Sequence, residues 1–431
     1  MSTGQGFEIR DPIHGAVRVS WQERVIVDHP FVQRLRGIRQ LGFSHLPFPG
    51  ATHSRYAHSV GAFHLAGKAF DSALGGSALV QGELVTSERG RALRDVVRLA
   101  ALCHDLGHAP FSHAAEFAMP PVSALGIERA AGGPDRQATH EDYTVAILTR
   151  SSLAQTIADN FPFSPRHVAS LISPEITPPD DFFILDGLDH RPLLSQLISS
   201  DLDVDRMDYL VRDSTFTGAR YGAIDTDWLI SHLSFHVDEQ QRVCLALERP
   251  AILALDDFLI ARFHMFLMVY FHQKSIAYEK MLERYMRSPD CDYRLPADLD
   301  EWLWCDDAHL VSHLRNSTSE WARRIVQMRP YKLLVEAHGR LDQVDVSAHH
   351  QALQAAGVDV MEAGTRGALA RGPKPGVPPI YVLDRPRGLP EQVLPLDRAT
   401  TVFERYQDEH CIARLYVPRR EFERASGLLA G

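Results

Sequence analysis

Apolar residues recur at helical spacing through most of the chain, from residue 21 to about residue 325. Because a helix returns to the same face every three to four residues, this period predicts a largely helical body. Two segments rich in turn-forming residues, 122–135 and 173–181, interrupt the pattern, and we expect loops there. The predicted helices span 30–39, 54–74, 88–104, 140–150, 164–172, 192–212, 226–234, 251–288 and 306–328.

Strand-like patterns lie at the two ends of the sequence. Residues 7–20 alternate apolar and polar side chains around the pairs Asp11-Pro12 and His14-Gly15, which predicts a β-hairpin. After residue 330, short apolar runs predict strands at 331–337, 358–363, 379–384 and 413–417 and helices at 344–356 and 418–429. We therefore expect a mostly α protein with an N-terminal β-hairpin, a helical core at 1–328 and a small α/β lobe at 329–431.

Composition narrows the classes of function. The net charge is −10, so no overall positive field attracts nucleic acid, and we expect no such partner. The five cysteines are scattered and form no C-x-x-C pair, which is typical of reduced thiols in a cytoplasmic protein. The first residues lack the apolar core of a signal peptide, and the apolar run 265–271 is too short to cross a bilayer, so we expect no membrane association.

One short segment gathers titratable side chains behind an apolar helix. Residues 101–116 read A-L-C-H-D-L-G-H-A-P-F-S-H-A-A-E. His104 and Asp105 close the predicted helix 88–104, and Gly107 suits a helix C-cap. An imidazole beside a carboxylate suits a borderline or hard divalent metal. The alternative interpretation is a purely structural H-D pair.

Two other segments could complete a metal site. His58 lies early in the predicted helix 54–74, and a row of acidic and phenolic side chains follows one face of the predicted helix 192–212. The members of this row are Asp201, Asp205, Tyr209 and Asp213. Acids repeated on one face repel each other unless a cation lies against them. Taken alone, each feature also fits a core histidine or a solvated face, but the order H…HD…D on separate helices favours a shared metal site.

The sequence resembles the HD-domain metal-dependent phosphohydrolases, whose signature is H…HD…D. It is most similar to the deoxynucleoside triphosphate triphosphohydrolase (dNTPase) branch, which includes vertebrate proteins that add a sterile-alpha-motif domain. The similarity extends over roughly residues 7–280. It is carried by D-P-I-H-G (11–15), F-V-Q-R-L-R-G-I-R-Q-L-G (31–42), F-P-G-A-T-H-S-R-Y-A-H-S-V-G (48–61), C-H-D-L-G-H-A-P-F-S-H (103–113), T-H-E (139–141) and D-V-D-R-M-D-Y-L-V-R-D (203–213).

This resemblance implies a metal cofactor. Its ligands would be His58, His104, Asp105 and Asp205. Within the acidic row the resemblance therefore selects Asp205 rather than Asp201. The ligand set fits a divalent transition metal (Fe, Mn, Co, Ni or Zn), and Mg²⁺ could assist.

The resemblance also implies the reaction, which is hydrolysis of a dNTP to deoxynucleoside and inorganic triphosphate. The general acid would be His113, with Glu116 beside it where the family commonly has aspartate. His108 and His140 would line the phosphates, or they would pack around the metal. The remaining substrate contacts would be Arg55 and Arg206 to the phosphates, Tyr209 to the sugar, Asp213 and Gln40 to its 3′-hydroxyl, and Leu41 to its 2′ side. An aromatic residue, Tyr270 or Phe271, would complete the 2′ wall.

Dimeric and tetrameric relatives in this branch use a second nucleotide site. The residues that match it here are Asp28, Gln33 and Arg36, which implies a GTP or dNTP activator and a homo-oligomer. The alternative is that these three residues serve in helix capping and salt bridging.

Two competing functions remain. An HD phosphohydrolase could act on another nucleotide phosphoester, such as a guanosine alarmone, a cyclic dinucleotide or a nucleoside monophosphate. A non-catalytic nucleotide sensor or single-stranded nucleic-acid binder is the third hypothesis. The Tyr209–Asp213 sugar contact favours a free nucleoside triphosphate, and the intact ligand set with His113 argues against an inactive site.

Overall fold

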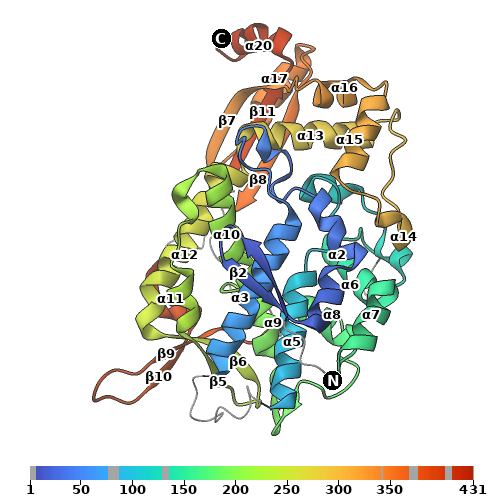
Figure 1. Cartoon of the computed structure of the whole chain (residues 1–431). Helices are drawn as coiled ribbons and strands as arrows, with labels where there is room; N and C mark the ends of the chain where they lie inside the picture. Colours follow the sequence, from blue (N-terminus) through green and yellow to red (C-terminus); the bar gives the residue numbers. More distant parts are fainter. Residues whose placement is uncertain are drawn as a thin grey trace.

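The computed structural model describes residues 6–75, 87–128, 135–340, 343–367, 377–402 and 410–430. Helices form most of it, with a hairpin against the helical body and a small sheet toward the C-terminus (Figure 1). The predicted fold class is therefore confirmed. In the described part of the chain, no helix is both long and apolar enough to cross a membrane.

The hairpin consists of β1 (Phe7–Asp11) and β2 (Gly15–Val19), paired antiparallel as predicted. Gly15 has a φ of 73°, a left-handed conformation that glycine adopts at little cost. Asp11 accepts hydrogen bonds from two backbone amides of the turn, one of them that of His14. The turn therefore holds His14 against the helical body, where it contacts α10 (Val204–Thr217).

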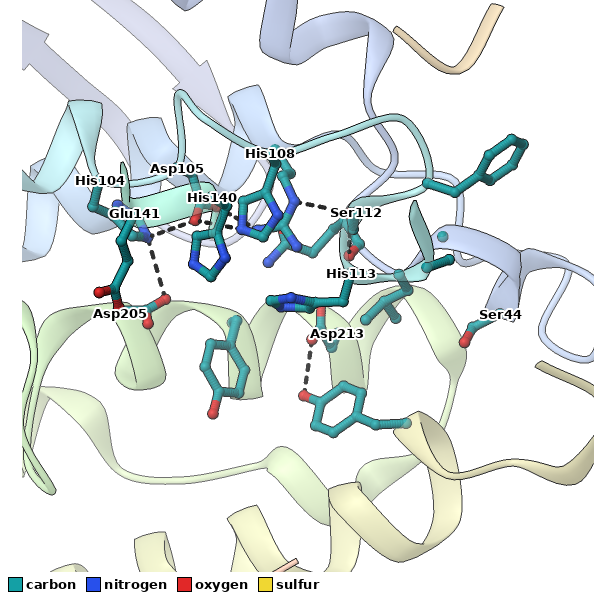
Figure 2. A pocket seen from close by; sticks show the side chains of 18 of the residues that line it. Ser44, His104, Asp105, His108, Ser112, His113, His140, Glu141, Asp205 and Asp213 are labelled. Carbon is teal, nitrogen blue, oxygen red and sulfur yellow. Dashed lines mark hydrogen bonds and ion pairs between the residues drawn. The ribbon is translucent and has the colours of Figure 1, made fainter. Parts of the chain in front are cut away.

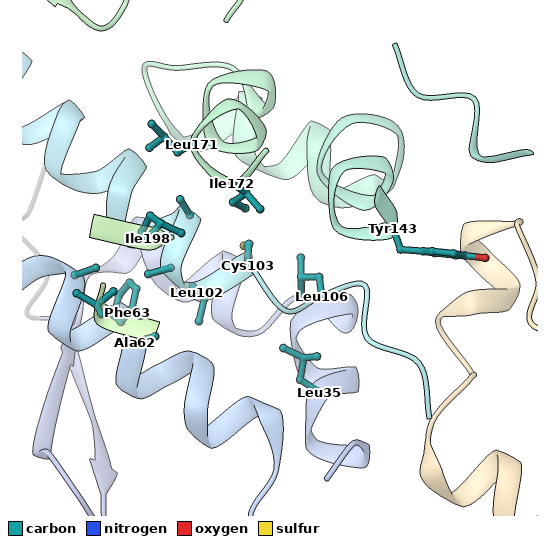
Figure 3. Close-up of a cluster of buried hydrophobic side chains, with 14 of the residues drawn as sticks. Leu35, Ala62, Phe63, Leu102, Cys103, Leu106, Tyr143, Leu171, Ile172 and Ile198 are labelled. Atoms are coloured by element: carbon teal, nitrogen blue, oxygen red, sulfur yellow. The ribbon is translucent and has the colours of Figure 1, made fainter. Parts of the chain in front are cut away.

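The helical body is built around α3 (Arg55–Gly75), α5 (Glu88–Cys103) and α10, and α3 packs against both others. Their buried apolar side chains belong to one continuous core that includes Phe63 and Leu102 (Figure 3). The other helices of this body are α1 (Trp21–Val27), α2 (Pro30–Arg34), α6 (His140–Arg150), α7 (Ser152–Asn160), α8 (Pro165–Ile172), α9 (Arg191–Ile198), α11 (Thr226–Ser231), α12 (Ile252–Met265), α13 (Gln273–Arg287), α14 (Leu299–Trp302), α15 (Asp307–Asn316) and α16 (Glu320–Val326).

The prediction of one helix over 192–212 was wrong, because α9 and α10 are separate. Asp203 caps α10 by accepting hydrogen bonds from the backbone amides of Ser200 and Arg206, both at 2.8 Å. These local bonds replace the helical ones at the break. Asp201 consequently precedes α10 and does not share the helix face on which it was predicted.

Two other predicted helices are also divided. The segment 251–288 forms α12, a π-helix (Phe266–Tyr270) and α13, and the side chain of His272 caps α13. The segment 306–328 forms α15 and α16. The apolar run 265–271 ends at this break, and the short polar stretch His272–Ser275 that follows it does not by itself interrupt the helical period.

Two strands lie inside the region that was predicted to be helical. β5 (Leu233–Val237) and β6 (Val243–Glu248) form an antiparallel hairpin. β6 also pairs in parallel with β9 (Tyr381–Asp384), and β10 (Gln392–Pro395) completes a sheet of order β10-β9-β6-β5. This sheet thus joins residues from both sides of the predicted boundary at 329.

A second sheet of order β7-β11-β8 lies at the C-terminal end. Its strands pair antiparallel, and it has its own apolar cluster, which includes Leu353, Leu415 and Ala425. The elements of this part are β7 (Lys332–Arg340), α17 (Ser347–Ala355), β8 (Met361–Gly367), α18 (Leu396–Ala399), β11 (His410–Val417) and α20 (Phe422–Ala430). A small hairpin of β3 (Ile184–Leu185) and β4 (Leu188–Asp189) precedes α9. The division into two lobes at 329 stays a prediction.

Candidate metal centre and adjoining cavity

The turn after α5 brings the H-D pair against α6. His104 is the C-cap residue of α5, and its backbone is right-handed. The φ of Gly107 is not positive, and the cap residue is His104. The prediction that Gly107 caps the helix was therefore wrong. A Cβ at this position would collide with the carbonyl oxygen of His140 and lie 2.5 Å from the amide nitrogen of Thr144. Glycine is needed here because α6 approaches the turn closely.

Three predicted ligands converge in the structure. Asp205 Oδ1 lies 3.0 Å from His58 Nε2 and 3.5 Å from His104 Nε2, and the two Nε2 atoms are 3.3 Å apart. Asp105 lies beside them, 3.3 Å from His104 Nε2 and 3.7 Å from His58 Nε2. Two imidazoles and two carboxylates fit a borderline divalent metal. The donor chemistry therefore fits the metal that the motif implies, and the figure shows His104, Asp105 and Asp205 at one end of the cavity (Figure 2).

The second nitrogen of each histidine already has an acceptor. His58 Nδ1 is 2.8 Å from Asp208 Oδ2, and His104 Nδ1 is 2.7 Å from the carbonyl oxygen of Ala101. A proton on each Nδ1 leaves each Nε2 unprotonated, with a lone pair directed toward the shared centre that can bind a metal. Such outer contacts usually fix the orientation and the tautomer of metal-binding histidines.

Asp208 links this centre to the hairpin. It is fully buried and contacts His58, His14 at 2.6 Å and Arg212 at 2.8 Å, and Arg212 in turn pairs with Asp11. Burial would raise the pKa of Asp208, but Arg212 and the two histidines hold it well below its usual range. Asp208 therefore connects His58 to the turn between β1 and β2.

The centre carries an excess of negative charge. Burial disfavours a proton on His58, yet hydrogen bonds and charges from Asp205 and Asp208 raise its pKa to about 10. A proton or a metal ion could supply the missing positive charge. Arg55 supplies part of it, since its Nη1 lies 2.6 Å from Asp105 Oδ2.

Three more histidines stand beside the centre. The rings of His108 and His140 are stacked with centroids 4.1 Å apart, and His113 lies edge-on to both. Glu116 holds two of them, since its carboxylate oxygens lie 2.8 Å from Nδ1 of His113 and 2.8 Å from Nδ1 of His140. Burial would raise the pKa of Glu116, but the hydrogen bonds and charges of His113 and His140 hold it far below its usual range. His108 Nε2 faces Asp105 at 3.2 Å.

A cavity of about 440 Å³ connects the metal cluster to an aromatic group on α10 and the π-helix. Asp213 accepts a hydrogen bond from the hydroxyl of Tyr270 at 2.8 Å and lies 2.7 Å from Nε2 of His53. Tyr209 lies edge-on to Tyr270. Phe271 also lines the cavity, but Tyr270 is the aromatic residue that contacts Asp213.

The other predicted substrate residues fall into two groups. Gln40, Leu41 and Arg55 line the cavity. Gln40 is buried, and no hydrogen-bond partner reaches its Oε1 among the described residues. Arg206, in contrast, pairs with Asp203 and is not among the described residues that line the cavity.

The three residues predicted for a second nucleotide lie away from this cavity. Arg36 Nε donates to Gln33 Oε1 at 2.7 Å, and its guanidinium lies 3.6 Å from the centre of the Tyr56 ring. Asp28 instead pairs with Arg24 at 3.1 Å. Gln33 and Arg36 therefore lie together, and the activator role of all three residues stays a prediction.

Sequence reasoning missed several residues that shape the cavity. Glu141 follows His140 in the T-H-E string, so its neighbour could have indicated it. Glu279 lies on α13 with no motif around it, and burial raises its pKa to about 7. Contacts between distant segments placed it there, and the local sequence gave no signal.

Comparison with known proteins agrees with this geometry. Residues 55–213 match the HD domain and residues 224–363 match the HD-associated region. The fold and the histidine–aspartate cluster therefore agree with an HD domain at residues 55–213, and the chain is similar to proteins of the dNTPase branch. Human deoxynucleoside triphosphate triphosphohydrolase SAMHD1 is 32% identical over 251 residues, which cover 55% of this chain and 37% of that protein.

Other relatives match a larger part of the chain. An uncharacterized protein of Methanocaldococcus jannaschii is 29% identical over 76% of this chain and 59% of its own length, and one of Bacillus subtilis is 31% identical over 64% and 54%. The chain thus spans little more than half the length of these curated relatives. A solved hypothetical protein from Aquifex aeolicus aligns over 98% of this chain and 99% of its own, with a TM-score of 0.74 and 26% identity. A phosphohydrolase from Bacteroides thetaiotaomicron shares the fold, with a TM-score of 0.69 and 22% identity over 96% of this chain and 100% of its own.

Proposed function

We propose that this protein is a metal-dependent hydrolase that converts dNTPs to deoxynucleoside and inorganic triphosphate. One observation carries the proposal: the metal cluster and the Tyr209–Asp213–Tyr270 group line the same cavity, with His113 on its wall. A volume of about 440 Å³ suits a small-molecule ligand. The similarity to proteins named as deoxynucleoside triphosphate triphosphohydrolases supports this choice of substrate.

The metal would be held by His58, His104, Asp105 and Asp205. When bound, such an ion polarises a phosphoryl oxygen and lowers the pKa of a coordinated water. The contacts of His58 with Asp208 and of His104 with Ala101 would keep both rings oriented for it.

His113 would protonate the 5′ oxygen as it leaves the α-phosphorus. Glu116 accepts from Nδ1, so the ring presents Nε2 as the donor. Desolvation lowers the pKa of His113, which makes its protonated form a stronger acid, and a neighbouring triphosphate would favour that protonated form.

The triphosphate would lie along Arg55, His108 and His140. Arg55 is fixed for this role by Asp105 and by Ser112, whose hydroxyl lies 2.9 Å from Arg55 Nε. We also assign a phosphate contact to Arg206, which requires its guanidinium to turn away from Asp203.

The sugar would lie between Tyr209 and Leu41. The free Oε1 of Gln40 can accept the 3′-hydroxyl, and Asp213 can accept it as well. Tyr270 is already bonded to Asp213, so an added 2′-hydroxyl would meet occupied groups. A GTP or dNTP activator at Asp28, Gln33 and Arg36, a homo-oligomer and a cytoplasmic location belong to the same proposal.

The test is a product analysis. The purified protein is incubated with Mn²⁺ and each dNTP, and with GTP as the ribose control, and the products are separated. Deoxynucleoside with inorganic triphosphate supports the proposal, and dGTP should turn over at least ~10-fold better than GTP, because a buried site rejects an unpaired hydroxyl. Cleavage confined to an alarmone, a cyclic dinucleotide or a monophosphate would establish another phosphohydrolase, and binding without cleavage would establish a sensor.

A further inference from the structure

The loop that joins His108 to His113 has an unusual backbone. Phe111 and Ser112 are consecutive residues with φ of 57° and 61°. Residues with a Cβ adopt this left-handed region at a cost, and a structure keeps it only where neighbouring contacts impose it. The loop ends on the proposed general acid, so whatever imposes its shape also sets the position of that acid.

One carboxylate holds this loop from a distant part of the chain. Asp307, at the start of α15, accepts a hydrogen bond from the backbone amide of Phe111 at 2.7 Å through Oδ1. Its Oδ2 accepts one from the backbone amide of Arg39 at 3.1 Å. Asp307 is 6% exposed, so these bonds lie in the interior.

The two segments that Asp307 joins are also joined to each other. The hydroxyl of Ser112 donates to the carbonyl oxygen of Arg39 at 2.7 Å and accepts from Nε of Arg55 at 2.9 Å. The ring of Phe111 stacks on Phe43 with centroids 4.4 Å apart. One arm of this closed arrangement leads to Gln40 and the other to His113.

A carboxylate at position 307 would destabilise the fold if its role were only to pack against its neighbours. Burial raises its pKa to about 6, and the nearest cation is Arg39, whose Nη1 lies 3.8 Å away. A buried carboxylate with little ionic compensation destabilises a fold relative to an apolar residue. The backbone amides of Phe111 and Arg39 are two donors, and a carboxylate can accept from both at once because it has two oxygens.

We infer that Asp307 is a positioning residue that clamps the His108–His113 loop to the Arg39–Gln40 segment, and so places His113 over the leaving group. It lies outside the HD domain at 55–213, within the HD-associated region. The second region therefore contributes to the active site by holding a strained loop of the first. The effect on turnover rests on the proposed function, whereas the clamp itself can be measured without it.

The experiment compares Asp307→Asn with Asp306→Asn in the full chain. Both changes remove one charge from adjacent positions, but Asp306 accepts from the amide of His309 in the first turn of α15 rather than from the amides of Phe111 and Arg39. An asparagine at 307 keeps one acceptor and turns an amide donor toward the other backbone amide. Hydrogen exchange of the Phe111 and Arg39 amides is measured with metal content, kcat and KM for the best dNTP.

In Asp307→Asn we expect faster exchange at both amides, unchanged metal content, KM within ~3-fold and kcat lower by ~10- to 100-fold, the scale of a small misplacement of a catalytic group. Asp306→Asn should match the wild type in all four measurements. If Asp307→Asn does not fold, Ser112→Ala releases the same loop from its other side and should lower kcat by a similar factor. Only kcat is compared for this variant, because Ser112 also holds Arg55.

Wild-type kcat in a folded Asp307→Asn or Ser112→Ala protein would overturn the positioning role. Unchanged amide exchange in Asp307→Asn would overturn the clamp. If the wild type cleaves no dNTP, the proposed function fails, and the exchange data still decide on the clamp.

Discussion

At the scale of single residues, Glu116 orients the histidines around His113. One carboxylate accepts from two imidazoles and from the backbone amide of His140 at 2.9 Å. It therefore fixes both rings through Nδ1. The family commonly has an aspartate at this position. The longer side chain of Glu116 reaches both His113 and His140.

His113→Ala should leave the metal bound and slow turnover by ~10²–10⁴, the usual effect of losing a general acid. The reason is that His113 lies on the cavity wall but is not a ligand of the cluster formed by His58, His104 and Asp205. The measurements are metal content and kcat, with the exposed His349→Ala as the control. Turnover close to the wild-type value would transfer the acid role to His108 or His140.

Glu279 should make substrate affinity depend on pH. Burial raises its pKa to about 7, so the carboxyl is neutral below that pH and negative above it. A triphosphate in the same cavity is then repelled, and KM should rise by about fourfold between pH 6 and pH 8, the size of one charge at about 10 Å in a medium of intermediate dielectric. The KM of Glu279→Gln divided by the KM of the wild type should therefore fall between pH 6 and pH 8. Parallel pH profiles for the two proteins would show that Glu279 does not face the substrate.

At the scale of elements, the approach of α6 to the H-D turn depends on a missing side chain. Gly107→Ala places a methyl group against the His140 carbonyl and the Thr144 amide. We expect a loss of about 3 kcal/mol in the free energy of unfolding, because backbone atoms cannot move aside cheaply. Activity should fall as well, since His140 begins α6.

The matched control is Gly427→Ala in α20, where a Cβ meets no atom within 4 Å. Alanine in a helix interior should stabilise by about 0.5–1 kcal/mol. Thermal unfolding of both variants checks the pair. Equal stability of Gly107→Ala and the wild type would mean that the turn and α6 can separate without cost.

The limits of sequence-based prediction are clear at this scale. α6 was predicted at 140–150 and forms His140–Arg150, because Thr139 and Asp142 make a capping box that the sequence displays. The break before α10 depends on the side chain of Asp203, which accepts hydrogen bonds from the backbone amides of Ser200 and Arg206. These bonds compete with helical hydrogen bonds only once both amides lie close to Asp203. β5 and β6 were not predicted, because β6 is stabilised by its pairing with β9, and the two strands of this pair lie far apart in the sequence.

The candidate site shows the same division. His58, His104, Asp105 and Asp205 could be selected from a short motif, and the structure brings them together. The π-helix determines that Tyr270 rather than Phe271 contacts Asp213, and which of the two walls the 2′ side of a sugar stays a prediction. Asp307 could not be selected, because its role depends on two backbone amides far from it in the sequence.

At the scale of the whole molecule, metal binding should couple to stability. His104→Ala combined with Asp105→Ala removes two of the four proposed ligands and should abolish both metal binding and hydrolysis. Mn²⁺ at ~100 times its Kd should stabilise the wild type by ~2.7 kcal/mol, since a ligand that binds only the folded state adds this much.

The double variant should show no such metal-dependent rise in Tm. Thermal unfolding with Mn²⁺ and with a chelator, together with elemental analysis, checks both proteins. Full metal occupancy in the double variant would refute the ligand assignment.

The parallel pairing of β6 with β9 has a consequence for how the chain is made. Ala246 pairs with Tyr381, so the ribosome must deliver α12 to α17 and β8 before the edge of β6 is covered. Until then the nascent chain presents a row of unpaired backbone groups, which can template a foreign strand. Pairing across so long a separation is also slow. Chains that stall or are cleaved ahead of residue 381 should therefore aggregate, and a chaperone that shields β6 during translation should raise the yield of folded protein.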